Sequence, residues 1–250
     1  MKITFIGSSH GVPTAERYCS SAMIEVGSAI YFVDAGAPIM DELLRLGKDI
    51  HDVRSVFITH CHSDHTNGII SMGTLLNWYY KKASVFFYVP EPEIISAFNA
   101  WNIANHDGAT NTDRLKFNVY EDGPVYEDEN ISVVAFPTAH IKKIEKPAHG
   151  FVITDKQSGK RIVFSGDLSQ WLEFEDFPVI AMSEEVDALV CEFAHFKPEH
   201  VDPYLKRCTA KAVYFNHVSP VSKIDIINNE MNGSYPFPVY ALADRDVIEL

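Results

Sequence analysis

A cluster of histidines with one aspartate is the feature that most constrains how this chain can fold. Residues 57–68 read Phe-Ile-Thr-His-Cys-His-Ser-Asp-His-Thr-Asn-Gly, with three imidazoles and one carboxylate between His60 and His65. The cluster follows an apolar run typical of a buried strand and precedes an apolar stretch of helical length. Nitrogen and oxygen donors that converge at the exit of a strand are what a divalent metal ion requires. The sequence therefore predicts a metal site.

The spacing within the cluster indicates how these donors divide between ions. His60 and His62 alternate along an extended segment, so their side chains point to the same side and can bind one ion. Asp64 and His65 lie past the turn, face a different direction and suit a second ion nearby. A solvated histidine-rich loop is the simpler interpretation, but it does not explain a position between a strand and a helix.

The composition describes an acidic chain with an ordinary hydrophobic content. Hydrophobic residues make up 46% of the 250 residues, enough for a substantial core, and the formal net charge is −13. This charge disfavours a general polyanion-binding surface, although bound cations would reverse the field at the site itself. Scattered cysteines, no signal peptide and no apolar run of membrane-spanning length favour a cytoplasmic protein without membrane contact.

Predicted strands repeatedly end in a turn that carries Asp or His. Outside the cluster, the residues at these positions are Asp34, His140, Asp167, His195 and His217. Ligands gather at one edge when the strands of a layered sheet run toward it. No linker rich in Pro, Gly or Ser divides the chain, so residues 1–250 are expected to form a single domain. The less regular segment 90–123 is either a lid over the site or an ordinary connection.

The order of these motifs over nearly the whole chain resembles the metallo-β-lactamase superfamily. The resemblance implies an α/β (α+β) fold, a four-layer αββα sandwich with a two-metal site at one edge. The ligands that it implies are His60, His62 and His140 for the first ion, and Asp64, His65 and His217 for the second. Asp167 would bridge both ions, and Asp34 would lie beneath the site as a hydrogen-bond acceptor that orients the ligands.

Two branches of the superfamily look most similar, and both cleave phosphodiesters. The ribonuclease Z branch has a Gly-rich opening loop with Val-Pro, as in residues 7–13, and a closing His-x-Ser-Pro, as in residues 217–220. The cyclic phosphodiesterase branch of phosphonate metabolism has two late histidines spaced as His195 and His200 are. Members that process transfer RNA carry a basic arm, whereas segment 90–123 is mixed in charge. This favours a small phosphorylated substrate over RNA.

The resemblance implies hydrolysis of a small phosphodiester or nucleotide-like substrate by a hydroxide activated between two divalent ions. Zinc suits the histidine and carboxylate ligands, and manganese or iron would also fit them. A histidine near the metals but not bound to them would protonate the leaving alkoxide. His200 is the first candidate and His195 the second. Asp64 would also orient or deprotonate the attacking water.

Other functions stay open at this stage. The same site would serve a ribonuclease Z-like RNA endonuclease, or a lactone or thioester hydrolase with a tyrosine near the metals as oxyanion donor. A non-hydrolytic binding or redox module is a further alternative, and a homodimer is compatible with all of them. The sequence does not place the candidate tyrosines, which are Tyr18, Tyr204 and Tyr214. Three histidines have no partner pattern and are expected in solvent: His51, His106 and His149.

Overall fold

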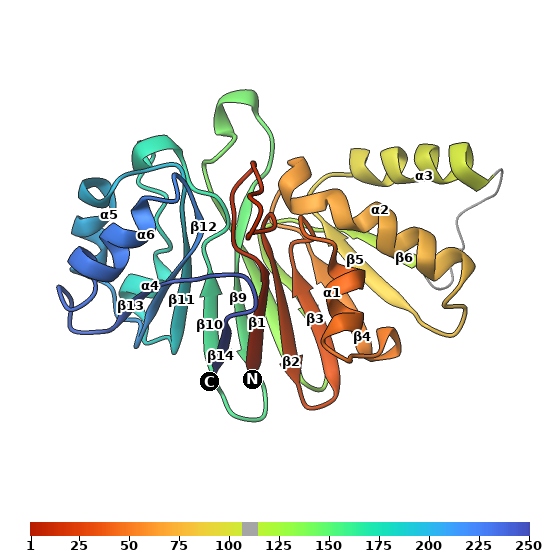
Figure 1. Cartoon of the computed structure of the whole chain (residues 1–250), viewed down its shortest axis with the longest axis horizontal. Coiled ribbons are helices and arrows are strands. Elements are labelled where there is room, and N and C mark those ends of the chain that lie inside the picture. The colour runs from red at the N-terminus through yellow and green to blue at the C-terminus, as the bar shows by residue number, and fades with distance from the viewer. Residues whose placement is uncertain (107–114) are drawn as a thin grey trace.

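The computed structural model describes residues 1–106 and 115–250 and arranges them as two facing sheets with helices outside (Figure 1). The first sheet has the strand order β14-β1-β2-β3-β4-β5-β6. Its strands are β1 (Lys2–Gly7), β2 (Ser21–Val26), β3 (Ala29–Val33), β4 (Val53–Phe57), β5 (Val85–Val89), β6 (Leu115–Val119) and β14 (Val247–Glu249).

The second sheet has the strand order β13-β12-β11-β10-β9-β8-β7. Its strands are β7 (Gly123–Glu127), β8 (Ile131–Pro137), β9 (His149–Asp155), β10 (Arg161–Phe164), β11 (Ala188–Phe193), β12 (Val213–Val218) and β13 (Val239–Ala241). The α-helices are α1 (Ile39–Arg45), α2 (Ser63–Trp78), α3 (Glu93–His106), α4 (Ile180–Ser183), α5 (Pro198–Leu205) and α6 (Lys223–Ile226). Short helical turns are η1 (Ile50–Asp52), η2 (Lys142–Ile144), η3 (Gln170–Leu172) and η4 (Ile227–Met231).

Three apolar clusters hold four layers together. Side chains alternate along each strand, so neighbours in sequence enter different clusters. In β3, Tyr31 packs between the two sheets with Phe57 and Phe151, whereas Phe32 faces the helices α1 and α2. A third cluster joins the second sheet to α4 and α5. The predicted αββα sandwich is confirmed, with α1–α3 outside one sheet and α4–α6 outside the other (Figure 1).

Parallel strands bring the chemically active residues to one edge of the sandwich. Strands β3 to β6 run parallel to one another in the first sheet, and β10 to β13 do so in the second. Carboxyl ends of parallel strands meet at the same edge, where ligands bind in many layered folds. Asp34 follows β3, His60 follows β4, and Asp167 follows β10. The two chain termini lie side by side away from this edge (Figure 1).

Helix α2 begins earlier than the sequence pattern indicates. The apolar periodicity predicts a helix over residues 69–80, but α2 starts at Ser63 and so carries Asp64 and His65 in its first turn. An acidic side chain is favourable there because the helix dipole is positive at its N-terminus. The first turn is polar and so does not contribute to the apolar periodicity. The predicted start is therefore too late.

Close backbone contacts fix the start of α2 against the loop that carries Asp34. The Ala35 N–H donates to the His65 carbonyl at 2.8 Å, and the Gly68 N–H donates to the Ala35 carbonyl. A Cβ atom at Gly36 would lie 1.6 Å from the Asp64 carbonyl oxygen, so only glycine allows this approach. The two segments are therefore held at one spacing by their backbones.

Segment 90–123 contains α3, β6 and residues 107–114, and the last of these lie outside the described residues. Phe98 of α3 is buried against Gly73 of α2, which docks this helix onto the first sheet's outer layer. A role of this segment as a lid stays a prediction. In the described part of the chain, no helix has both the length and the apolar character needed to cross a membrane.

Candidate metal centre

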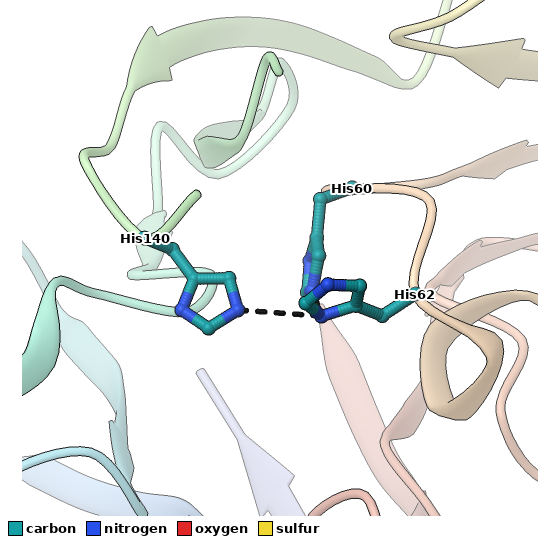
Figure 2. A group of neighbouring side chains, drawn as sticks. All are labelled: His60, His62 and His140. Carbon is teal, nitrogen blue, oxygen red and sulfur yellow. Dashed lines mark hydrogen bonds between the residues drawn. The ribbon is translucent and has the colours of Figure 1, made fainter. Parts of the chain in front are cut away.

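Three histidines from both halves of the sandwich converge on one point. His60 and His62 lie on the loop after β4, and His140 faces them from the loop after β8 (Figure 2). The His62 Nδ1 atom is 3.0 Å from His60 Nε2 and 3.3 Å from His140 Nε2. Ring nitrogens this close cannot all carry protons, and neutral imidazoles that converge on one point are donors that a divalent ion such as zinc takes.

A second group lies beside the first, with one carboxylate between them. The second group consists of Asp64, His65 and His217. The buried Oδ2 atom of Asp167 is 3.2 Å from His217 Nε2, 3.6 Å from His65 Nε2, 3.8 Å from His60 Nε2 and 3.7 Å from His140 Nε2. One oxygen thus faces imidazoles of both groups, the position that a bridging ligand would occupy.

Hydrogen bonds orient the imidazoles from behind. His65 Nδ1 lies 2.7 Å from Asp34 Oδ2, while the other carboxylate oxygen accepts the Thr59 N–H at 2.8 Å. His217 Nδ1 lies 2.8 Å from Ser20 Oγ, and His140 Nδ1 lies 3.2 Å from a backbone carbonyl. Histidine ligands of metal sites are usually held in this way, with the outer nitrogen bonded and the inner one free for the ion.

The donor set fits divalent cations. His65 Nε2 is buried and, among the described residues, has no hydrogen-bond partner, although Asp64 and Asp167 lie close. Burial and the neighbouring His65 hold the pKa of His60 well below its usual range, so this imidazole is neutral, the form that binds a metal. Burial alone would raise the pKa of Asp167, but His217 and His65 lower it, so the carboxylate is ionised.

His195 lies next to the two groups without belonging to either predicted ligand set. Its Nδ1 atom is 4.0 Å from Asp167 Oδ2, and its ring centroid is 4.5 Å from that of His140. The buried Glu192 carboxylate is hydrogen-bonded to the His195 ring, with 2.8 Å between Oε1 and Nδ1. Burial alone would lower the pKa of His195, but the hydrogen bond and charge of Glu192 raise it to about 9.

His200 lies elsewhere. Its Nδ1 atom accepts the Lys197 N–H at 3.1 Å, and its ring stacks on Trp171 with 6.5 Å between centroids. It lines a separate recess with Tyr204 and Arg207. Of the two candidates for the proton donor, His195 and not His200 lies beside Asp167. Sequence spacing cannot tell which histidine faces the metals once a turn and a helix start lie between them.

Two residues that the sequence did not assign to the site hold its loops. The Glu192 carboxylate accepts the Leu168 N–H at 3.0 Å as well as bonding to His195. One oxygen of Asp176 accepts the N–H groups of Ala139 and Ser169, both at 2.8 Å. Glu192 could have been found as the one charged residue in an otherwise apolar strand, whereas Asp176 gives no such signal.

One prediction about the remaining histidines is wrong. His149 was expected in solvent, but it is 4% exposed, and its Nε2 atom lies 3.0 Å from Asp122 Oδ1. Its partner belongs to a different strand connection, so no local pattern could reveal it. His51 is exposed as predicted. The side chain of His106 lies outside the described part of the structure.

Comparison with known proteins gives relatives in sequence and in fold. Ribonuclease Z of Microcystis aeruginosa is 30% identical over 163 residues, covering 62% of this chain and 48% of that protein. The chain thus spans about half the length of the curated relatives it matches. The metallo-β-lactamase fold protein YhfI from Bacillus subtilis is similar in structure, with a TM-score of 0.75, 18% identity and 99% coverage of both chains.

A diphosphatase from the PhnP family also has a similar structure, with a TM-score of 0.70, 16% identity and coverage of 100% of this chain and 97% of that one. These two structural likenesses establish the fold. The family model described as anti-Pycsar protein Apyc1 matches residues 1–177, a range that includes the cluster, His140 and Asp167. The chain belongs to this anti-Pycsar protein Apyc1 family and has the fold of the metallo-β-lactamase fold protein YhfI.

Proposed function

We propose that this protein is a metal-dependent hydrolase that cleaves a small phosphodiester or nucleotide-like substrate with the help of two divalent cations. The observation that carries the proposal is the place of Asp167 Oδ2, within 4 Å of imidazoles from both groups. The residues that would hold the cations are His60, His62 and His140 on one side, Asp64, His65 and His217 on the other, and Asp167 between them. When bound, two such cations activate water and polarise a phosphoryl oxygen, and zinc suits the donors.

The chain's own side chains would handle the protons. Asp64 Oδ2 lies 3.4 Å from His65 Nε2, inside the site, where it can orient the attacking water and accept its proton. The hydrogen bond to Glu192 favours the protonated form of His195, and its ring lies beside both groups, so it can donate to the leaving oxygen. Glu192 keeps His195 both charged and oriented.

Two observations support a small phosphodiester as the substrate. The matched relative is named a ribonuclease Z, and one structural neighbour is a diphosphatase, so both names refer to phosphate-ester or phosphate-anhydride chemistry. The net charge of −13 works against binding a long polyanion.

The test is a substrate panel with metal-loaded protein. The panel contains bis-para-nitrophenyl phosphate, a cyclic nucleoside monophosphate, a precursor transfer RNA, a lactone and a thioester. We expect turnover of the two small diesters that is abolished by a chelator and restored by zinc or manganese. Turnover of the lactone or thioester alone would contradict the proposal.

RNA cleavage is the second candidate, because the matched relatives carry the name ribonuclease Z. Specific cleavage of the precursor RNA with a preference over the small diesters would favour it. The lactone or thioester alternative has no comparable support. Two of the three candidate tyrosines pack on other rings, since Tyr204 stacks on Phe177 and Tyr214 on Tyr240.

A further inference from the structure

The turn that carries His195 follows β11 directly. Its backbone N–H groups donate to a charged side chain. Glu192 accepts the Ala194 N–H at 2.6 Å and the His195 N–H at 3.1 Å. The same carboxylate bonds the His195 ring, so the backbone and the side chain are oriented together. A turn held only in this way would still leave its carbonyl groups to be satisfied.

A buried lysine from a distant part of the chain binds the carbonyl side of this turn. Lys223, the first residue of α6, is only 7% exposed. Its Nζ atom donates to the carbonyls of Phe193 at 2.8 Å, Ala194 at 3.2 Å and Phe196 at 2.7 Å. An ammonium group has three N–H donors, so these three bonds use all of them. Lysine is rarely buried unless it is paired in this way.

The remaining carbonyl of the turn also has a partner. The His195 carbonyl accepts the Trp171 N–H at 2.9 Å. All four carbonyls from residue 193 to residue 196 are therefore bonded, three of them to one side chain. Nζ also lies 4.7 Å above the Phe193 ring, which is a favourable place for a cation. Removing the ammonium would free the carbonyls of Ala194 and Phe196 and leave the Phe193 carbonyl with the Ser219 N–H at 3.4 Å.

We propose that Lys223 is a positioning residue that fixes the His195 turn, so that the imidazole meets the leaving oxygen of the substrate. The proposal rests on the proposed function, in which His195 is the proton donor. The Lys223 ammonium does not touch the two groups of candidate ligands, since it bonds to the carbonyls of the turn and lies over the Phe193 ring. Its effect should therefore reach the reaction through His195 alone.

The test compares two diesters that differ in how much their leaving group needs a proton. The alkoxide leaving group of a cyclic nucleoside monophosphate needs one, whereas the para-nitrophenolate of bis-para-nitrophenyl phosphate leaves without one. For Lys223→Met we expect kcat on the cyclic nucleotide to fall by about tenfold or more, part of the roughly 10²–10⁴-fold that general acid catalysis contributes. On the nitrophenyl ester we expect a change of less than about threefold, because no proton transfer is lost there.

Further variants separate positioning from general damage. Lys223→Arg keeps a cation with several donors and should recover part of the lost rate. Lys206→Met is the matched control, because Lys206 is an exposed lysine paired with Asp202 on α5. The double variant His195→Ala with Lys223→Met should be no slower on the cyclic nucleotide than His195→Ala alone, since the two residues act as one unit.

Hydrogen exchange gives a readout that does not depend on turnover. In Lys223→Met the amide protons of Ala194 and His195 should exchange about tenfold faster, while those of β10 and β12 keep their protection. If the wild type hydrolyses both diesters, two results would overturn the positioning role. One is an equal loss of kcat on both diesters in Lys223→Met, and the other is an additive loss in the double variant. If the wild type hydrolyses neither diester, the proposed function itself fails. Unchanged exchange in the turn would also contradict the proposal.

Discussion

The two halves of the sandwich present their candidate ligands in different ways. The first half supplies four of them within six residues, on the loop after β4 and the first turn of α2. The second half supplies His140, Asp167 and His217 singly, each on a different strand end. Backbone hydrogen bonds and a close glycine contact at Gly36 fix the first set. Gly166, next to Asp167, makes a similar contact in the second half, but there charged or polar side chains also hold the loops.

This difference teaches where the site is rigid and where it can vary. A ligand fixed by backbone packing moves only if the core moves, because interiors are close-packed. A ligand loop held by Asp176 or Glu192, or the His195 turn held by Lys223, can be loosened by changing one side chain far away in sequence. We therefore expect substitutions in the first half to have severe, all-or-none effects on the site. Substitutions of the side chains that hold the loops of the second half should have graded effects.

The largest effect should come from His65→Ala, which removes one candidate ligand and leaves Asp34 without its imidazole partner. We expect kcat/KM to fall at least about 1000-fold, because even the loss of an outer partner of a metal ligand costs 10–100-fold. Metal content should fall in parallel. His51→Ala, an exposed histidine, is the control and should behave as wild type. Unchanged activity of His65→Ala would contradict the proposal that two metal ions are bound.

Gly36→Ala tests whether backbone contact fixes the first half. The new Cβ would lie 1.6 Å from the Asp64 carbonyl oxygen, so the free energy of unfolding should fall by about 3 kcal/mol, the upper end of overpacking costs. Gly11→Ala is the matched control, since its Cβ would meet Asp64 at an ordinary 3.5 Å. Denaturant unfolding of both variants measures this. Equal stabilities would show that the contact is not rigid.

His195→Ala and His200→Ala form the next comparison. We expect the first variant to lose about 100-fold in kcat on an alkoxide-leaving diester, within the usual range for a general acid. The second should lose no more than about threefold, because His200 bonds to Lys197 and stacks on Trp171 away from Asp167. Steady-state kinetics on one substrate decide between them. A larger loss in His200→Ala would restore the order that the sequence spacing favoured.

The smallest effects should come from two carboxylates that hold the loops of the site, one in each half. Asp34→Asn weakens the bond to His65 and should lower metal affinity by about 10- to 100-fold. Asp176→Asn keeps an acceptor oxygen for the loops at Ala139 and Ser169 and should cost only about 1 kcal/mol of stability. Competition with a metal-binding dye and thermal unfolding measure the two. A stronger effect of Asp176→Asn on metal affinity would reverse the proposed contrast.

The sequence predicted most where the relevant residues are contiguous. The spacing from His60 to His65 indicated two sets of donors, and the motif order indicated the four-layer sandwich that the structure confirms. The start of α2 was placed too late because its first turn is polar, and periodicity sees only apolar residues.

The sequence predicted least where residues distant along the chain meet. Lys223 bonds to carbonyls about thirty residues away, and Asp176 joins loops on two different strands, so no local pattern reveals either contact. The choice between His195 and His200 depends on the turn after β11, whose shape is set by Glu192 and Lys223 together. Such side-chain tethers depend on tertiary packing, which a motif does not encode.

The most direct test of the central claim is the metal content of the purified protein, measured together with its diesterase activity before and after chelation. The account predicts two divalent ions per chain, a loss of bis-para-nitrophenyl phosphate hydrolysis when they are removed, and recovery when they are restored. A protein that hydrolyses the diester equally well without bound metal would contradict it. So would a chain that, after loading, retains no divalent ion at His60, His65 and Asp167.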